Sequence, residues 1–306
     1  IKKGKILREN VVFRFATGYY YQPPFYRAIR NFSGDLNPSI RAQKSIHFVL
    51  GGDYIFELWD RPFKFGGELY YKHLSDIIPY KIDNIRVRYY GNNNAKGYAT
   101  GIDLKLNGEF VKGIESYASL SWLKTEEDIL NDSYWTYYNS QNEQIINGYT
   151  TDNVPVDSTV TYPGYIPRPT DQRVSFALFF QDQMPKEWDT EKVKWSTCKV
   201  NLNLLFGTRL PYGPPSAERL SDTLRSSFYR RLDIGFSKDI INSETDKSKF
   251  KQNSLLHKVK HMWIAFEVFN LLDISNTTNY SWIKDVTGRQ YSVPNFLTSR
   301  RLNLKL

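Results

Sequence analysis

The sequence predicts an all-β protein in which about ten antiparallel strands form the wall of a transmembrane β-barrel. Three observations predict this fold. Apolar and polar residues alternate with a period of two in one segment after another. The polar side of this alternation carries many charged side chains, which a dry protein core could not bury at tolerable cost. No run of 18 apolar residues is present, so we expect no transmembrane helix.

The alternation is clearest near the C-terminal end. Residues 302–306 read Leu, Asn, Leu, Lys and Leu, apolar and polar in strict order. Upstream, Ile264, Phe266 and Val268 lie at alternate positions and face one way, whereas Glu267 faces the other. Both segments are therefore predicted to be strands with two chemically different faces.

Eight further strands are predicted upstream of these two. The four longest, residues 10–21, 44–56, 62–73 and 173–181, span 9–13 residues, enough for the roughly 9–11 residues that cross a bilayer at a tilt. The eight comprise residues 10–21, 44–56, 62–73, 102–107, 118–122, 173–181, 199–206 and 231–237.

The polar face decides between a soluble sheet and a membrane wall. A sheet with water on its polar face would still need a cover for the apolar face of about ten strands, and no segment has the 3.6-residue period of a covering helix. Lipid outside and a hydrated lumen inside satisfy both faces. We therefore expect one set of residues to face lipid: Phe176, Leu204, Ile234 and Phe266. A second set is expected to face the lumen: Lys105, Asn203, Asp233 and Glu267.

The connections between the predicted strands alternate in length. Short turns at 57–61 and 109–115 alternate with long segments at 22–43, 74–98, 124–170, 208–225 and 273–295. This asymmetry is typical of bacterial outer-membrane barrels, whose long loops are extracellular. With ten strands, the C-terminus then lies in the periplasm. Two connections on the short side are longer, 184–196 and 240–257, and we expect the lysine-rich second one to be a mobile periplasmic turn.

Aromatic residues in the longest loop are the candidate ligand-binding residues. They are Tyr134, Trp135, Tyr137 and Tyr138. Aromatic faces stack on sugars, chelator rings and corrins, but these side chains could equally pack the loop against its neighbours or lie at the membrane interface. Five other aromatic residues are expected to form the outer aromatic girdle of the barrel: Tyr19, Tyr20, Tyr21, Trp282 and Tyr291.

Composition argues against several other functions. The net charge of +9 comes from 41 basic and 32 acidic residues that are interleaved without a basic stripe, so we expect no nucleic-acid binding. His257 and His261 would lie about 13 Å apart on a strand, too far to share a metal. No nucleophile–base arrangement, phosphate-binding loop or metal-spaced cysteine set is present, so we expect neither an enzyme nor a cofactor. The single Cys198 is interpreted as a small apolar residue.

Two glycine pairs lie inside predicted strands. Gly51-Gly52 and Gly66-Gly67 could mark the close approach of a ligand. They are more typical of β-bulges or of places where a barrel wall bends.

Several segments resemble TonB-dependent outer-membrane receptors of the Bacteroidetes type, which carry a carboxypeptidase-regulatory-like N-terminal domain. The resembling segments are 19–27 (YYYQPPFYR), 166–173 (IPRPTDQR), 206–215 (FGTRLPYGPP), 230–237 (RRLDIGFS), 268–272 (VFNLL) and 300–303 (RRLN). Together they span essentially the whole chain, and none of them is specific to a substrate.

The resemblance implies a 22-stranded barrel closed by a plug domain, which imports a scarce ligand such as a siderophore, cobalamin, a saccharide or a peptide with energy from TonB. Residues 1–306 are then expected to be the C-terminal portion of such a barrel, with the plug and the TonB-coupling segment absent. Outer-membrane lipid and the TonB system are the expected partners. A surface lipoprotein is a further expected partner if the ligand is a saccharide or peptide. The alternative is a self-standing ten-stranded barrel that acts as a passive pore or adhesin.

Overall fold

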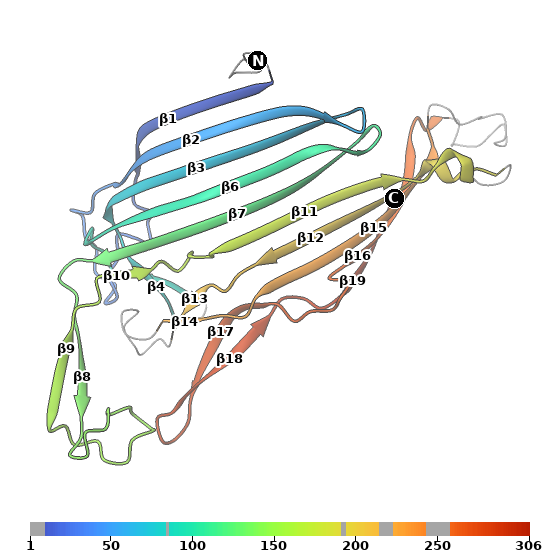
Figure 1. The fold of residues 1–306 in the computed structure, drawn as a ribbon. Helices are drawn as coiled ribbons and strands as arrows, with labels where there is room; N and C mark the ends of the chain where they lie inside the picture. Colours follow the sequence, from blue (N-terminus) through green and yellow to red (C-terminus); the bar gives the residue numbers. More distant parts are fainter. Residues whose placement is uncertain (1–9, 84–85, 191–193, 214–222, 243–257) are drawn as a thin grey trace, which may run out of the picture.

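The computed structural model describes residues 10–83, 86–190, 194–213, 223–242 and 258–306. Ten strands form one antiparallel sheet in the order β1-β2-β3-β6-β7-β11-β12-β15-β16-β19, and the short β10 (Tyr165–Pro167) pairs with β7. Figure 1 shows this sheet as one continuous curved wall, with β1 at one edge and β19 at the other. The predicted order of ten strands is confirmed. Among the described residues, no helix is long and apolar enough to span a membrane.

The ten strands of the wall have the following bounds. They are β1 Val11–Gln22, β2 Gln43–Leu58, β3 Arg61–Ile77, β6 Ala95–Val111, β7 Ile114–Ile129, β11 Val174–Gln183, β12 Cys198–Gly207, β15 Tyr229–Ile241, β16 Met262–Phe269 and β19 Arg301–Lys305. Four of them, β2, β3, β6 and β7, contain 16 or 17 residues and are longer than predicted. Their pairing continues beyond the apolar part of the wall, where the alternation that marks a strand in the sequence has already ended.

The strand registers bring residues of the same predicted face opposite one another on neighbouring strands. On the apolar face, Leu204 lies opposite Leu178 on one side and Leu232 on the other. On the polar face, Asn203 lies opposite Asp233, and Glu267 opposite both Gly235 and Asn303. Because side chains alternate along every strand, this register separates an apolar outer face from a polar inner face across the wall.

Charged groups on the inner face are paired with one another. The guanidinium of Arg14 in β1 bonds to Asp53 in β2 and lies 3.6 Å from the Glu68 carboxylate in β3. Lys64 also reaches Asp53, at 3.4 Å. At the other edge of the sheet, the Lys305 ammonium lies 2.8 Å from Glu267. These pairs neutralise inward charges in a lumen where water also screens them.

One glycine of each pair, Gly51 and Gly66, faces this inner network. The β2–β3 pairing runs without a break past both glycine pairs, so of the two predicted alternatives, a bulge or a bend, the bulge is wrong. A Cβ on Gly66 would lie 3.0 Å from the Asp53 carboxylate, and one on Gly51 would meet Glu68 at 3.4 Å. The absent side chains therefore leave room for the larger charged groups of neighbouring strands.

Aromatic rings lie at both ends of the apolar outer face. Near the loops, Tyr98 stacks with Tyr71 at 6.3 Å and contacts Tyr165 at 5.6 Å. Near the turns, Phe63 packs against three aromatic neighbours, Phe56, Phe110 and Trp59, at 5.7, 5.1 and 6.1 Å. Two such bands, with an apolar belt between them, are the pattern of a barrel wall at the two membrane interfaces.

The turns and loops alternate as predicted. β2 and β3 are joined by Trp59 and Asp60 alone, both with positive φ, 56° and 54°, as a tight hairpin turn of matching twist requires. The turn between β11 and β12 contains two short 3₁₀ helices, η1 (Lys186–Trp188) and η2 (Trp195–Thr197). Most of the connection from 240 to 257, which was predicted to be a mobile turn, lies outside the described residues.

In the described residues, the long loops contain four pairs of short strands that the sequence did not predict. They are β4 Tyr80–Asp83 with β5 Arg86–Tyr89, β8 Tyr134–Tyr138 with β9 Asp157–Thr161, β13 Pro211–Tyr212 with β14 Leu224–Arg225, and β17 Thr277–Lys284 with β18 Gln290–Phe296. In Figure 1, the β8–β9 and β17–β18 hairpins extend away from one end of the wall. Trp282 and Tyr291 lie on the β17–β18 hairpin, so their predicted place in the girdle of the wall is wrong.

Candidate ligand-binding site

Hydrogen bonds of the segment 166–173 hold the end of the longest loop against the wall. Asp171 is fully buried, and its carboxylate accepts a hydrogen bond from the Thr125 backbone N–H at 2.9 Å. Arg173 and Arg225 each donate to the same carboxylate, at 2.9 and 2.7 Å. A buried carboxylate with this many donors is well compensated. The segment therefore fixes the place where the chain leaves the loop and enters β11.

The same segment places Arg168 at the inner face of the wall. Its Nε donates to the carboxylate of Glu127 at 2.9 Å, and Glu127 is completely buried in β7. Within the described residues, the two terminal nitrogens of Arg168 donate no hydrogen bond. The Nε of the guanidinium is thus held by Glu127, while its two terminal nitrogens remain available to bind another group.

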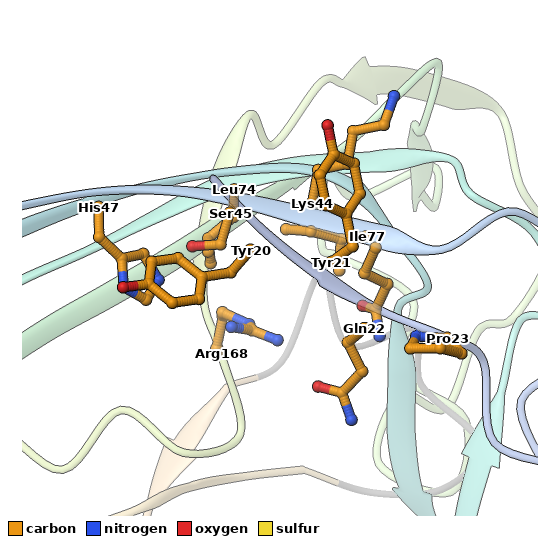
Figure 2. Close-up of a pocket in the computed structure, with 11 residues that line it drawn as sticks. Tyr20, Tyr21, Gln22, Pro23, Lys44, Ser45, His47, Leu74, Ile77 and Arg168 are labelled. Atoms are coloured by element: carbon orange, nitrogen blue, oxygen red, sulfur yellow. The ribbon is translucent and has the colours of Figure 1, made fainter. Parts of the chain in front are cut away.

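Arg168 borders a cavity at the loop end of β1, β2 and β3. The cavity has a volume of about 470 Å³, and its lining includes Tyr20, Ser45, His47 and Leu74. The rings of Tyr20 and His47 are stacked, with centroids 4.1 Å apart and an interplanar angle of 27°. Figure 2 shows Tyr20, His47 and Arg168 on one side of these strands, whereas Lys44 extends to the other.

Tyr20 was predicted to belong to the outer girdle, and this prediction is wrong. Tyr20 lies opposite Ser45 and shares the inner face of β1 with Arg14. Tyr19 and Tyr21, one residue away on either side, take the outer face because side chains alternate along a strand. The alternation itself could have identified Tyr20 as the inward member of the three.

Two polar groups lack a hydrogen-bond or ion-pair partner in the described part of the chain: Ser45, which lines the cavity, and Lys72, which lies opposite the lining residue His47. The Ser45 hydroxyl is buried and makes no hydrogen bond. Lys72 lies opposite His47 in the register and contacts the Tyr70 ring at 5.1 Å, but no acidic group is within ion-pair distance of it among the described residues. Lys44, by contrast, is paired with Asp76 at 2.8 Å. The inner side of the cavity therefore offers uncommitted hydrogen-bond donors and positive charge.

The four aromatic residues predicted to bind ligand lie elsewhere, on β8. None of them lines the cavity. Trp135 and Tyr137 are 56% and 47% exposed, whereas Tyr134 and Tyr138 are half-buried on the opposite face of the hairpin. The strand thus divides the predicted set into two pairs, and a single flat ligand could stack on only one of them.

The predicted separation of His257 and His261 stays a prediction. His261 lies 3.8 Å from Asp239, and His257 is outside the described residues. In the part of the chain that the structure describes, no group of three or more His, Cys, Asp or Glu side chains is arranged to hold a metal ion.

Sequence reasoning missed the cavity residues. Arg168 belongs to the segment 166–173, which carries the family resemblance, and Ser45 and His47 lie within the predicted strand 44–56. One pattern could have indicated Arg168 as a site residue. It is an arginine in a loop that returns to the wall, placed beside a buried acidic residue of a strand, which here is Glu127. The cavity itself depends on the pairing of β1 with β2, which no local pattern reveals.

Comparison with known proteins identifies the fold. No protein-family model and no curated protein sequence matches the chain. Among solved structures, the ferric-catecholate import receptor Fiu from E. coli K12 superposes with a TM-score of 0.54 at 14% identity, over 97% of this chain and 32% of Fiu. The copper transporter OprC gives 0.54 at 11% identity, over 97% and 37%. The ferric yersiniabactin uptake receptor FyuA from Yersinia pestis gives 0.52 at 16% identity, over 97% and 35%.

These likenesses show that the chain has the fold of a segment of a large β-barrel. It spans about a third of the length of the structures it matches, 32% to 37% for these three. More specifically, its fold is that of part of the barrel of TonB-dependent receptors, as the resemblance of its segments implied.

Proposed function

We propose that the chain forms part of the barrel of a TonB-dependent outer-membrane receptor that imports a scarce ligand. The observation that carries the proposal is the ten-strand wall itself. Its apolar outer face is bordered by aromatic bands, several of its inner charges are paired, and it follows the barrels of import receptors over 97% of its length. A wall with these two faces fits lipid on one side and a hydrated passage on the other.

The orientation and coupling follow from this proposal. The long loops with their hairpins are extracellular, and the short turns and the C-terminus are periplasmic, because short turns of bacterial barrels face the periplasm. Energy reaches the receptor from TonB through a region outside residues 1–306. A receptor of the Bacteroidetes type, with a surface lipoprotein as partner, is the more specific form of the proposal. No catalytic step is proposed.

The ligand class is open within this proposal. The similar structures are a ferric-catecholate import receptor, a ferric yersiniabactin uptake receptor and a copper transporter, so one fold accompanies different ligands. Siderophores, cobalamin, saccharides and peptides are the classes we propose to test. The polar and aromatic loop residues suit stacking and hydrogen bonding with any of them.

A self-standing ten-stranded pore is disfavoured by the sheet edges. In the described structure, β1 and β19 each pair with one strand only. Their outer backbone groups would lack hydrogen-bond partners in lipid, which costs several kcal/mol per group by rough estimate. Residues 1–306 expressed alone should therefore aggregate or misassemble. A monodisperse, heat-modifiable barrel made from this chain alone would instead support the hypothesis of a self-standing pore.

Import can be tested in the organism that encodes the chain. The gene is deleted, and uptake of labelled ferric siderophores, cobalamin, oligosaccharides and peptides is compared with uptake in the parent strain and in a strain lacking TonB. We expect uptake of one class to fall to the same low level in both mutants. Uptake that depends on the gene but not on TonB would contradict energy coupling, and unchanged uptake of every class would contradict import.

A further inference from the structure

We propose that the cavity between Tyr20, Ser45, His47 and Arg168 binds a carboxylate carried by the imported ligand, beside a flat ring that stacks on Tyr20. The inference rests on the proposed import function and names one chemical group of its ligand. It concerns the inner wall of the lumen, apart from the aromatic residues of the extracellular hairpins.

Arg168 provides the directional part of the site. A guanidinium presents its donors in a planar fork that matches the two oxygens of a carboxylate. Here Nε is occupied by Glu127 at 2.9 Å, which fixes the plane of the group. Arg168 lines the cavity, and its terminal nitrogens have no partner in the described residues. An arginine held at one edge by a buried acid loses little freedom when it binds an anion at the other.

Ser45 provides an independent sign of a missing partner. Its hydroxyl oxygen is buried and makes no hydrogen bond in the described structure. A buried hydroxyl without a partner is unfavourable, so most are satisfied by protein, water or ligand. Ser45 lines the same cavity as Arg168, so the two residues with unpartnered donors border one space.

Tyr20 and His47 provide a flat wall. One face of the Tyr20 ring stacks on His47 at 4.1 Å, yet the residue is still 55% exposed. The remaining face is therefore open to a planar group, and an aromatic ring favours such offset stacking. Because His47 supports the ring from behind, Tyr20 is held in place before the ligand arrives.

The charges around the cavity favour an anion over a neutral group. The charge of Arg168 is balanced by Glu127, but Lys72, opposite His47, has no acidic group within ion-pair distance in the described residues. Lys44, which lines the cavity, shares the single carboxylate of Asp76 with Arg41. A surplus of positive charge in a partly enclosed site attracts carboxylates and weakly repels cations.

The test uses the complete receptor in detergent micelles and two matched probes, benzoate and benzamide. Both carry the same ring, but only benzoate carries a charge. Saturation-transfer NMR measures their weak binding. We expect benzoate to bind at least about tenfold more tightly than benzamide, since a hydrogen-bonded charge pair contributes about this factor or more.

Variants assign the binding to the cavity. Arg168→Lys keeps a positive charge beside Glu127 but loses the fork, and Ser45→Ala removes a hydroxyl that has no partner to lose. Both should leave assembly of the receptor intact and weaken benzoate binding about three- to tenfold. Tyr20→Leu should weaken both probes equally, and its matched control Tyr19→Leu, on the outer face, should change neither.

Three results would overturn the inference. The first is equal binding of the two probes, and the second is benzoate binding that Ser45→Ala and Arg168→Lys leave unchanged. The third is no benzoate binding at all, as expected if an acidic side chain elsewhere in the receptor fills the cavity. Uptake of the native ligand separates this inference from the proposed function. Gene- and TonB-dependent uptake that Tyr20→Leu and Ser45→Ala do not alter contradicts the cavity alone, whereas uptake independent of the gene contradicts import.

Discussion

The guanidinium of Arg289 lies over the ring of Tyr149, 5.0 Å from its centroid, and joins the tips of two hairpins from different loops. Its Nε also donates to the carbonyl oxygen of Gly148 at 2.5 Å. Gly148 has a φ of 82°, and a Cβ there would lie 2.6 Å from the Arg289 backbone nitrogen, so only glycine permits this approach. The β8–β9 and β17–β18 hairpins thus form a closed arch beyond the end of the wall (Figure 1).

Arg289→Ala should open this arch. The substitution removes a cation–π contact and a charged hydrogen bond, together about 1–2 kcal/mol at an exposed site. Spin labels at Gln141 and Val286, in a Cys198→Ser background, report the distance between the hairpin tips. We expect a narrow distribution in the parent receptor and a broad one in the variant. Lys284→Ala, on the same hairpin but outside the contact, is the control, and broadening in the control as well would contradict the assignment.

Acidic pH should loosen the same arch through Asp285. Hydrogen bonds from the Thr287 side chain, and from the backbone of Thr287 and Arg289, hold the pKa of this carboxyl below its usual range. Because the folded-state pKa is depressed, its contribution is present above the ordinary aspartate pKa of about 3.9 and is lost as pH falls through the lower, folded value. The distance distribution should therefore broaden below about pH 4. Asp285→Asn should remove this pH dependence, and an unchanged titration in that variant would assign it to another group.

The two faces of the wall should respond differently to a charge. Leu204→Arg near the bilayer midplane should cost about 2–4 kcal/mol, because it places a charge in lipid. Asn203→Arg should cost little, because it faces the lumen opposite Asp233. Denaturant unfolding of the complete receptor from lipid bilayers measures both. Labelling of cysteines from the aqueous lumen that reaches position 204 but not position 203 would reverse the assignment.

The wall could be predicted from the sequence because each strand faces two solvents. At Leu204 and Asn203, lipid and water select opposite residue types one position apart, which leaves the two-residue period in the sequence. The segment that forms the β8–β9 hairpin shows no such two-residue period. Its residues Tyr134–Tyr138 are aromatic on both faces because neither face borders lipid. Turn chemistry and self-pairing alone set its structure.

The cavity could not be predicted for a different reason. Tyr20, His47 and Arg168 come from three separate segments, and only the register of β1 with β2 and the Arg168–Glu127 contact bring them together. Taken alone, each residue is typical of a polar position in a wall strand or a loop. The register of paired strands is a property of the whole sheet, so residues that it gathers carry no shared local pattern.

The loop aromatic residues remain candidate ligand contacts, and the structure sharpens their test. Deleting residues 131–159 removes β8 and most of β9 but no strand of the ten-strand wall. We expect this deletion to weaken uptake while leaving assembly of the barrel intact. It also removes Tyr149 and therefore opens the arch, so point substitutions are needed to separate the two effects.

Those substitutions follow the two faces of β8. Trp135→Ala with Tyr137→Ala removes the exposed pair, and Tyr134→Ala with Tyr138→Ala removes the half-buried pair. If the exposed rings stack on the ligand, at about 0.5–1.5 kcal/mol each, the first double variant should lose roughly tenfold in affinity or more. The second should mainly lower the stability of the hairpin, measured by the spin-label distances. Ligand affinity that survives the deletion and all four substitutions would show that this loop only covers the surface of the receptor.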